Sequence, residues 1–128
     1  MQNKVIFSAF NDNDADYNGQ ITYNHLIVNK GDGMDISKGI FTSPVKGIYS
    51  FAFMATTGAD TSDTNIFVRK NGELEIQIVD CSDSSYKNLS GSWLLVLNQG
   101  DQVDLYVSGG HLGGPGNNYK WYTIFSGQ

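Results

Sequence analysis

The sequence has little cysteine and no long apolar run, and each scarcity excludes a class of protein. Cys81 is the only thiol, so no intrachain disulfide can form and a hydrophobic core has to hold the fold together. No apolar run approaches the roughly 20 residues that a membrane-spanning helix requires. No segment carries an uninterrupted helical period with caps, which argues against a helical fold.

Positive charge is also scarce. The chain has 8 Lys and Arg residues against 13 Asp and Glu residues, a net charge of −5, and it contains no basic cluster. Nucleic-acid binding depends on such clusters, so we expect no nucleic-acid partner. Neither a Gly-x-Ser-x-Gly motif nor a catalytic carboxylate pair is visible, and we therefore expect no enzymatic activity.

Aromatic residues and glycine are abundant, with 7 Phe, 7 Tyr and 15 Gly in 128 residues. This composition is typical of many short strands joined by tight turns. The length suits one domain that can bury a core without metal or disulfide support. We therefore predict a single all-β domain over residues 1–128, built as an antiparallel sandwich or jelly roll.

The segment 47–54 is the centre of this prediction. Tyr49, Phe51 and Phe53 alternate with the small residues Ser50 and Ala52, which is the period of two expected of a strand. Three aromatic side chains on one face supply enough apolar surface for the middle of a core. With the inward positions of two later strands, the predicted core consists of Tyr49, Phe51, Phe53, Leu95, Leu97 and Phe125.

Alternation and turn residues predict the remaining strands. Asn71-Gly72 is the strongest hairpin signal in the chain. His25 falls inside an extended stretch, where we expect it to be packed rather than catalytic. Including the central segment, the predicted strands cover residues 5–10, 21–29, 48–54, 65–70, 74–78, 93–97, 103–107 and 121–125.

The predicted strands fall into two kinds. The hairpin 66–78 and the strand 103–107 have one apolar and one polar face, whereas the strands 48–54, 93–97 and 121–125 have two uncharged faces. A sandwich needs apolar residues only on the inward face of each sheet, and a second apolar face usually marks association. We therefore predict self-association through Ser50, Ala52, Leu94, Val96, Tyr122 and Ile124.

A longer-range motif runs through the first half of the sequence. Tyr23 is followed, at family-typical spacing, by Asn29, Met34, Phe41 and the segment 47–53. This arrangement resembles the signature of the C1q domain family, the globular head of the complement first component. Later pieces of the chain agree with the resemblance: Lys70-Asn71-Gly72, Ser90-Gly91-Ser92, Gly100-Asp101 and Phe125-Ser126-Gly127.

The chain departs from the family pattern at a few positions. Met34 stands where the family prefers an aromatic residue, Asp104 stands where it commonly has Trp, and the chain stops at Gln128, where members often continue. These departures leave the expected fold unchanged. Because no collagen-like Gly-X-Y stretch precedes the domain, the chain resembles stand-alone, head-only members, many of them from invertebrate immunity.

The resemblance implies a ten-stranded jelly roll of the tumour-necrosis-factor type, a homotrimer and secretion to the extracellular space. It implies an innate-immune, lectin-like module that recognises patterns on microbial or host surfaces, glycans included. The alternative is a structural or signalling trimer that engages a protein receptor without binding glycans.

An acidic loop near the start of the chain is a candidate metal site. Asp12, Asp14 and Asp16 place carboxylates at alternate positions, a pattern that suits calcium. The loop is not an EF-hand, because Tyr17 occupies the position that requires glycine. Some members of the resembled family carry calcium near the trimer axis or apex. The alternative is a solvated acidic loop without a metal.

A glycine-rich loop late in the chain, residues 109–119, is a candidate ligand site. Its glycines would let a ligand approach the backbone closely, and binding residues often lie on loops of rigid sandwiches. The alternative is a simple connection between two strands. The candidate ligand-binding residues are His111, Asn117, Asn118 and Tyr119.

Overall fold

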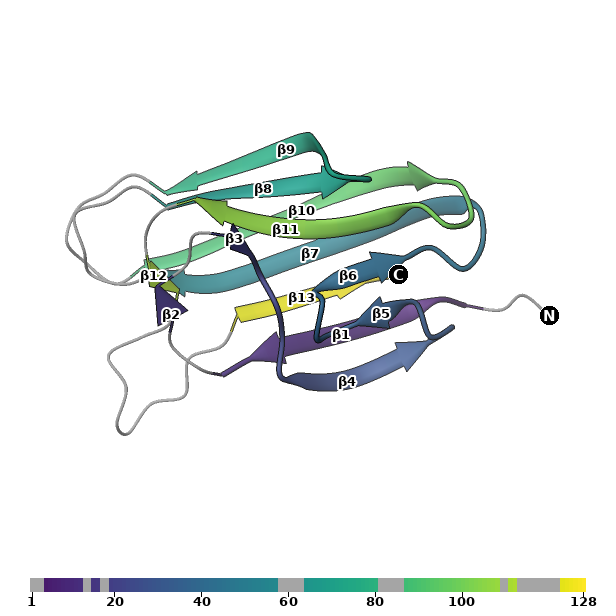
Figure 1. Cartoon of the computed structure of the whole chain (residues 1–128), viewed down its shortest axis with the longest axis horizontal. Helices are drawn as coiled ribbons and strands as arrows, with labels where there is room; N and C mark the ends of the chain where they lie inside the picture. Colours follow the sequence, from purple (N-terminus) through teal and green to yellow (C-terminus); the bar gives the residue numbers. More distant parts are fainter. Residues whose placement is uncertain are drawn as a thin grey trace.

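The computed structural model describes residues 4–12, 15–16, 19–57, 64–80, 87–108, 111–112 and 123–128. In these ranges the chain forms strands packed as two antiparallel sheets, and they contain no helix (Figure 1). Consequently no described segment is a helix long and apolar enough to cross a membrane. The prediction of an all-β jelly roll is confirmed.

The seven-stranded sheet has β7 at its centre, because β10 pairs with one edge of β7 and β13 with the other (Figure 1). β1 and then β4 continue the sheet beyond β13, and the short β12 and β2 extend it from the end of β7. Its members are β1 (Ile6–Asn11), β2 (Ala15–Asp16), β4 (His25–Lys30), β7 (Gly47–Thr57), β10 (Lys87–Leu97), β12 (His111–Leu112) and β13 (Thr123–Gly127).

The six-stranded sheet packs against it and runs in the order β5-β6-β11-β8-β9, with β3 also paired to β11. Its members are β3 (Gly19–Gln20), β5 (Met34–Asp35), β6 (Ile40–Thr42), β8 (Thr64–Lys70), β9 (Glu73–Asp80) and β11 (Gln102–Ser108).

The two kinds of strand distinguished by their alternation lie in different sheets. The strands with two uncharged faces became β7, β10 and β13 of the seven-stranded sheet. Those with one polar face became β8, β9 and β11 of the six-stranded sheet. The difference between the faces therefore belongs to whole sheets rather than to single strands.

The core lies between the sheets and is rich in aromatic rings. Phe7 of β1 stacks on Phe41 of β6 across the sandwich, with 4.8 Å between ring centroids, and meets Phe125 edge-on at 4.9 Å. Burying each such ring stabilises the fold by about 2–3 kcal/mol. Of the predicted core residues, Leu95 is partly buried, and the others are buried: Tyr49, Phe51, Phe53, Leu97 and Phe125.

The turn at Asn71-Gly72 has the predicted hairpin geometry. Both residues have positive φ angles, 53° and 82°, as a two-residue type I′ turn requires. Glycine adopts this conformation without strain, and asparagine is among the residues that tolerate it best.

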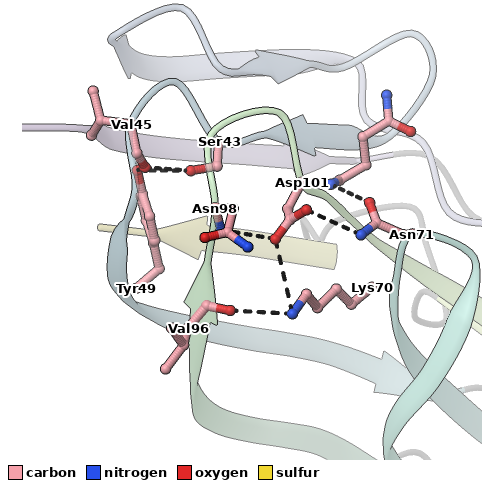
Figure 2. Close-up of polar contacts among 9 residues, drawn as sticks. Ser43, Val45, Tyr49, Lys70, Asn71, Val96, Asn98 and Asp101 are labelled. Atoms are coloured by element: carbon pink, nitrogen blue, oxygen red, sulfur yellow. Dashed lines mark hydrogen bonds and ion pairs between the residues drawn. The ribbon is translucent and has the colours of Figure 1, made fainter.

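A network of hydrogen bonds joins this hairpin to the turn between β10 and β11 (Figure 2). The Asp101 carboxylate accepts hydrogen bonds from the Asn98 backbone N–H at 2.8 Å and from the Asn71 side-chain amide at 3.2 Å. The side-chain oxygen of Asn71 accepts a hydrogen bond from the Gln102 backbone N–H at 2.9 Å. The bond from Asn98, followed by that from Asn71, holds the pKa of the Asp101 carboxyl below its usual value.

The predicted extended stretch 21–29 differs from the structure. Ile21 and Tyr23 are buried, but the strand β4 begins only at His25, and Ile27 is 66% exposed. β4 is an edge strand, and a register shift opposite Ser8 and Ala9 interrupts its alternation. His25 packs on Phe10, with 4.6 Å between ring centroids, yet its side chain stays 49% exposed.

Candidate functional site

The outward face of the seven-stranded sheet carries a row of small residues. The strand register places Ser8 of β1 opposite Ser126 of β13, Ser126 opposite Ala52 of β7, and Ala52 opposite Ser92 of β10. These four residues form a line across the middle of the sheet, which we call the small-residue row. Short side chains in this line leave the backbone accessible to a partner surface.

Larger apolar residues flank the small-residue row on both sides. Phe10, Ile124 and Met54 follow one another in register on one side. Leu94 and Val96 lie on the other side, where they are 65% and 62% exposed. The row therefore forms the floor of a shallow trough with apolar walls.

Two hollows along this trough show its depth. One, of about 410 Å³, lies between β7, β10 and β13, and is lined in part by Ala52, Met54, Ser92 and Ile124. The other, of about 260 Å³, lies between β1, β7 and β13, and includes Ser8 and Ser50. The trough thus has room for side chains of another surface.

The described outward side chains of β1, β7 and β13 and of residues 88–97 are all uncharged. Charged or titratable outward groups occur at the edge strand β4, in His25 and Lys30, which pair with Phe10 and Ile6. An exposed apolar face without charge is unusual on a monomeric protein.

The residues predicted to mediate self-association lie on this face wherever they are described. Ser50, Ala52, Leu94 and Val96 are exposed and Ile124 is half-buried, whereas Tyr122 lies outside the described residues. The alternation of each strand was enough to find them. The alignment of Ser8, Ser92 and Ser126 with Ala52 was not predicted, because it depends on the pairing register.

The acidic loop is described only in part. The Asp12 carboxylate accepts a hydrogen bond from the Asn24 amide at 2.8 Å, and His25 Nε2 lies 3.3 Å from its other oxygen. The Asn24 bond is the main cause that lowers the pKa of the Asp12 carboxyl. Asp14 lies outside the described residues, and Asp16 is described only as part of β2. Among the described residues, no group of three His, Cys, Asp or Glu side chains could hold a metal ion.

A short described segment of the glycine-rich loop pairs with a short described segment of the acidic loop, which the sequence did not reveal. His111 begins β12 and pairs in register with Asp16 of β2, so these two short strands lie side by side at one end of the sandwich (Figure 1). The other predicted ligand-binding residues, Asn117, Asn118 and Tyr119, lie outside the described residues. No local sequence signal could have predicted this pairing, since it joins segments almost a hundred residues apart.

The chain matches one family model and resembles several solved structures. The family model described as "C1q domain" matches residues 6–128. The globular domain of zebrafish complement 1qA protein superposes with a TM-score of 0.77 at 24% identity, covering 98% of this chain and 96% of that one. The crystal structure of murine APRIL at pH 5.0 superposes with a TM-score of 0.73 at 15% identity, covering 95% of this chain and 97% of that one. The structure of Eiger TNF from S. frugiperda superposes with a TM-score of 0.70 at 11% identity, covering 98% of this chain and 92% of that one.

Proposed function

Because the chain belongs to the C1q domain family, we propose that it is a secreted recognition module, which forms a homotrimer and binds glycans or other patterns on microbial or host surfaces. Proteins with C1q and TNF-like domains are generally extracellular, act in recognition or signalling rather than catalysis, and typically form trimers.

The outward face of the seven-stranded sheet is the feature that supports the proposed trimer. Its small-residue row is uncharged, and the exposed flanks are apolar residues that a monomer would leave in water. A contact between this face and a different surface of the next copy closes into a ring when the rotation is threefold. Such burial would supply the hydrophobic contact of an obligate assembly.

A trimer also suits recognition of repetitive surfaces. Three copies of one site face the same partner, so the binding of the first site raises the effective concentration of the others. Weak individual contacts then suffice for firm attachment to a surface. The paired β2 and β12 end of the sandwich and the six-stranded sheet remain available in an assembly held by the other sheet.

Two measurements test the proposal. Light scattering coupled to size exclusion should give three times the chain mass of 14.0 kDa across micromolar dilution. A glycan array probed with the same material should then show binding that is lost when the trimer is dissociated. A monomeric mass would contradict the assembly, and a stable trimer that binds no glycan would favour a module that engages a protein receptor.

A further inference from the structure

The outward face of the six-stranded sheet carries a row of side chains that the proposed assembly leaves uncovered. Tyr106 of β11 lies opposite Phe67 of β8, Gln20 of β3 lies opposite Tyr106, and Gln77 of β9 lies opposite Phe67. The resulting order across four strands is amide, ring, ring, amide, and we call it the aromatic row. At the usual strand spacing it spans about 14 Å.

The rings of the aromatic row face away from the core. Their chain neighbours Ile66, Val68 and Leu105 are fully buried, so alternation turns Phe67 and Tyr106 outward, where both are half-buried. The ring centroids lie 6.4 Å apart at an angle of 34°. Together they form a broad apolar platform rather than isolated exposed rings.

A bidentate ion pair supports one side of this platform. Arg69 Nε and Nη2 donate to the two carboxylate oxygens of Asp104 at 2.8 and 3.0 Å, and the guanidinium carbon lies 4.7 Å from the centre of the Tyr106 ring. This geometry restrains Tyr106 before any ligand binds.

The amides at the ends of the row are held as well. The side-chain nitrogen of Gln77 donates to the side-chain oxygen of Asn65 at 3.1 Å, and the side-chain nitrogen of Gln20 donates to the backbone carbonyl of Lys38. Each glutamine carbonyl oxygen can then accept a hydrogen bond. A cross-strand aromatic pair by itself stabilises a sheet, but it does not require restrained amides at both ends.

Charge favours one class of ligand. The positive charge of Arg69 is neutralised by Asp104, and the chain as a whole carries −5, so an anionic ligand would be repelled. Apolar rings flanked by precisely placed polar groups are the usual composition of small-ligand sites. A neutral sugar ring matches this face, because it has an apolar C–H side and hydroxyl groups at its rim.

We propose that the aromatic row binds neutral oligosaccharides, with Tyr106 and Phe67 stacking against sugar rings and Gln20 and Gln77 hydrogen-bonding to hydroxyl groups. This inference rests on the proposed recognition function and adds the position and charge of its ligand. It differs from the expectation that places the ligand on the loop 109–119. In a trimer held by the seven-stranded sheet, three aromatic rows would face outward.

The test uses the full chain and named probes. Mannan, β-glucan and galactan are immobilised, and dextran sulfate serves as an anionic comparison. We expect wild-type protein to bind at least one neutral polymer and not dextran sulfate. Phe67→Thr with Tyr106→Thr should weaken binding about tenfold or more, because aromatic anchors dominate such contacts. Val45→Thr, an exposed apolar-to-threonine change outside the row, is the matched control.

A second variant and a second measurement separate the alternatives. His111→Ala with Tyr119→Ala should bind normally, and oligosaccharide added to ¹⁵N-labelled wild-type protein should shift the backbone amide signals of Tyr106 and Phe67. That titration also decides the matter if the threonine variant does not fold. Normal binding by the threonine variant, or shifts confined to 109–119, would overturn the aromatic row while leaving glycan recognition intact. A wild-type trimer that binds none of the neutral polymers would refute both the aromatic row as a sugar site and glycan recognition by this protein.

Discussion

Both sheets of this sandwich turn mostly apolar residues inward, but their outward faces differ in charge. The face of the seven-stranded sheet exposes Met54, Leu94 and Val96 beside the small-residue row, and the described outward side chains of β1, β7, β10 and β13 carry no charge. The face of the six-stranded sheet carries Arg69 and Asp104 in a bidentate pair, which is only partly exposed.

The two faces therefore differ in what stabilises their side chains. Polar side chains that bind one another on the six-stranded sheet are stable in contact with water. The exposed apolar residues of the seven-stranded sheet gain free energy only when another surface covers them. The six-stranded face therefore pairs its charged side chains within the single chain, whereas the seven-stranded face gains stability only from a covering surface.

The largest expected effect comes from placing a charge in the small-residue row. Ala52→Asp would bury a carboxylate at each copy of a close apolar contact, at a cost of several kcal/mol per site. We expect the variant to be monomeric or insoluble, as measured by light scattering on freshly purified protein. Ala52 is exposed in the single chain, so the fold of one copy does not forbid the change.

Asp104→Ala on the opposite sheet is the matched control and should stay trimeric, since the proposed contact does not involve the six-stranded face. A soluble Ala52→Asp trimer with unchanged melting temperature would put the interface on another surface. Loss of the trimer in Asp104→Ala instead would reverse the assignment of the two sheets.

A smaller effect is expected when the ion pair on the six-stranded sheet is broken. Arg69→Met leaves the Asp104 carboxylate partly buried, and we expect a loss of about 1 kcal/mol in unfolding free energy with no change of oligomeric state. Urea unfolding of the variant gives the value. The double variant Arg69→Met with Asp104→Leu should recover most of the loss; an equal loss in both variants would mean that the charge left unpaired is not its cause.

Asp101 provides a pH-dependent test at the connection between the sheets. Its folded-state pKa is lowered, so its hydrogen bonds stabilise the fold above the ordinary aspartate pKa of about 4 and are lost as the pH falls through the folded value. Asp101→Asn should therefore melt below wild type at pH 7 and approach it in acid. Melting curves between pH 7 and 2 measure this, and a gap that stays constant with pH would exclude the carboxylate as its source.

The smallest effect is expected at the acidic loop. If calcium binds there through Asp12, Asp14 and Asp16, added calcium should raise the melting temperature of wild type by mass action, and chelator should lower it again. Asp12→Asn should reduce the response. Identical melting temperatures with calcium and with chelator would identify the loop as a solvated one, and neither outer sheet face would be affected.

Much of the fold was predictable from local pattern. Alternation through Tyr49, Phe51 and Phe53 placed the central strand, and Asn71-Gly72 placed the hairpin turn with its two positive φ angles. Even the sorting of strands into two sheets followed from the character of each strand's second face. These features were accessible because side-chain alternation and turn preference depend on residues next to one another in the chain.

The tertiary structure alone decided what lies beside what. The edge position of β4 left Leu26, Ile27 and Val28 exposed. The pairing of β2 with β12 joined short segments of the two candidate loops. The small-residue row and the aromatic row each exist only because four strands pair in one register, and of these pairings the turn at Asn71-Gly72 fixes that of β8 with β9. A shift of one residue would turn each side chain to the other face. Between strands distant in sequence no local pattern encodes the register, because packing across the whole sandwich selects it.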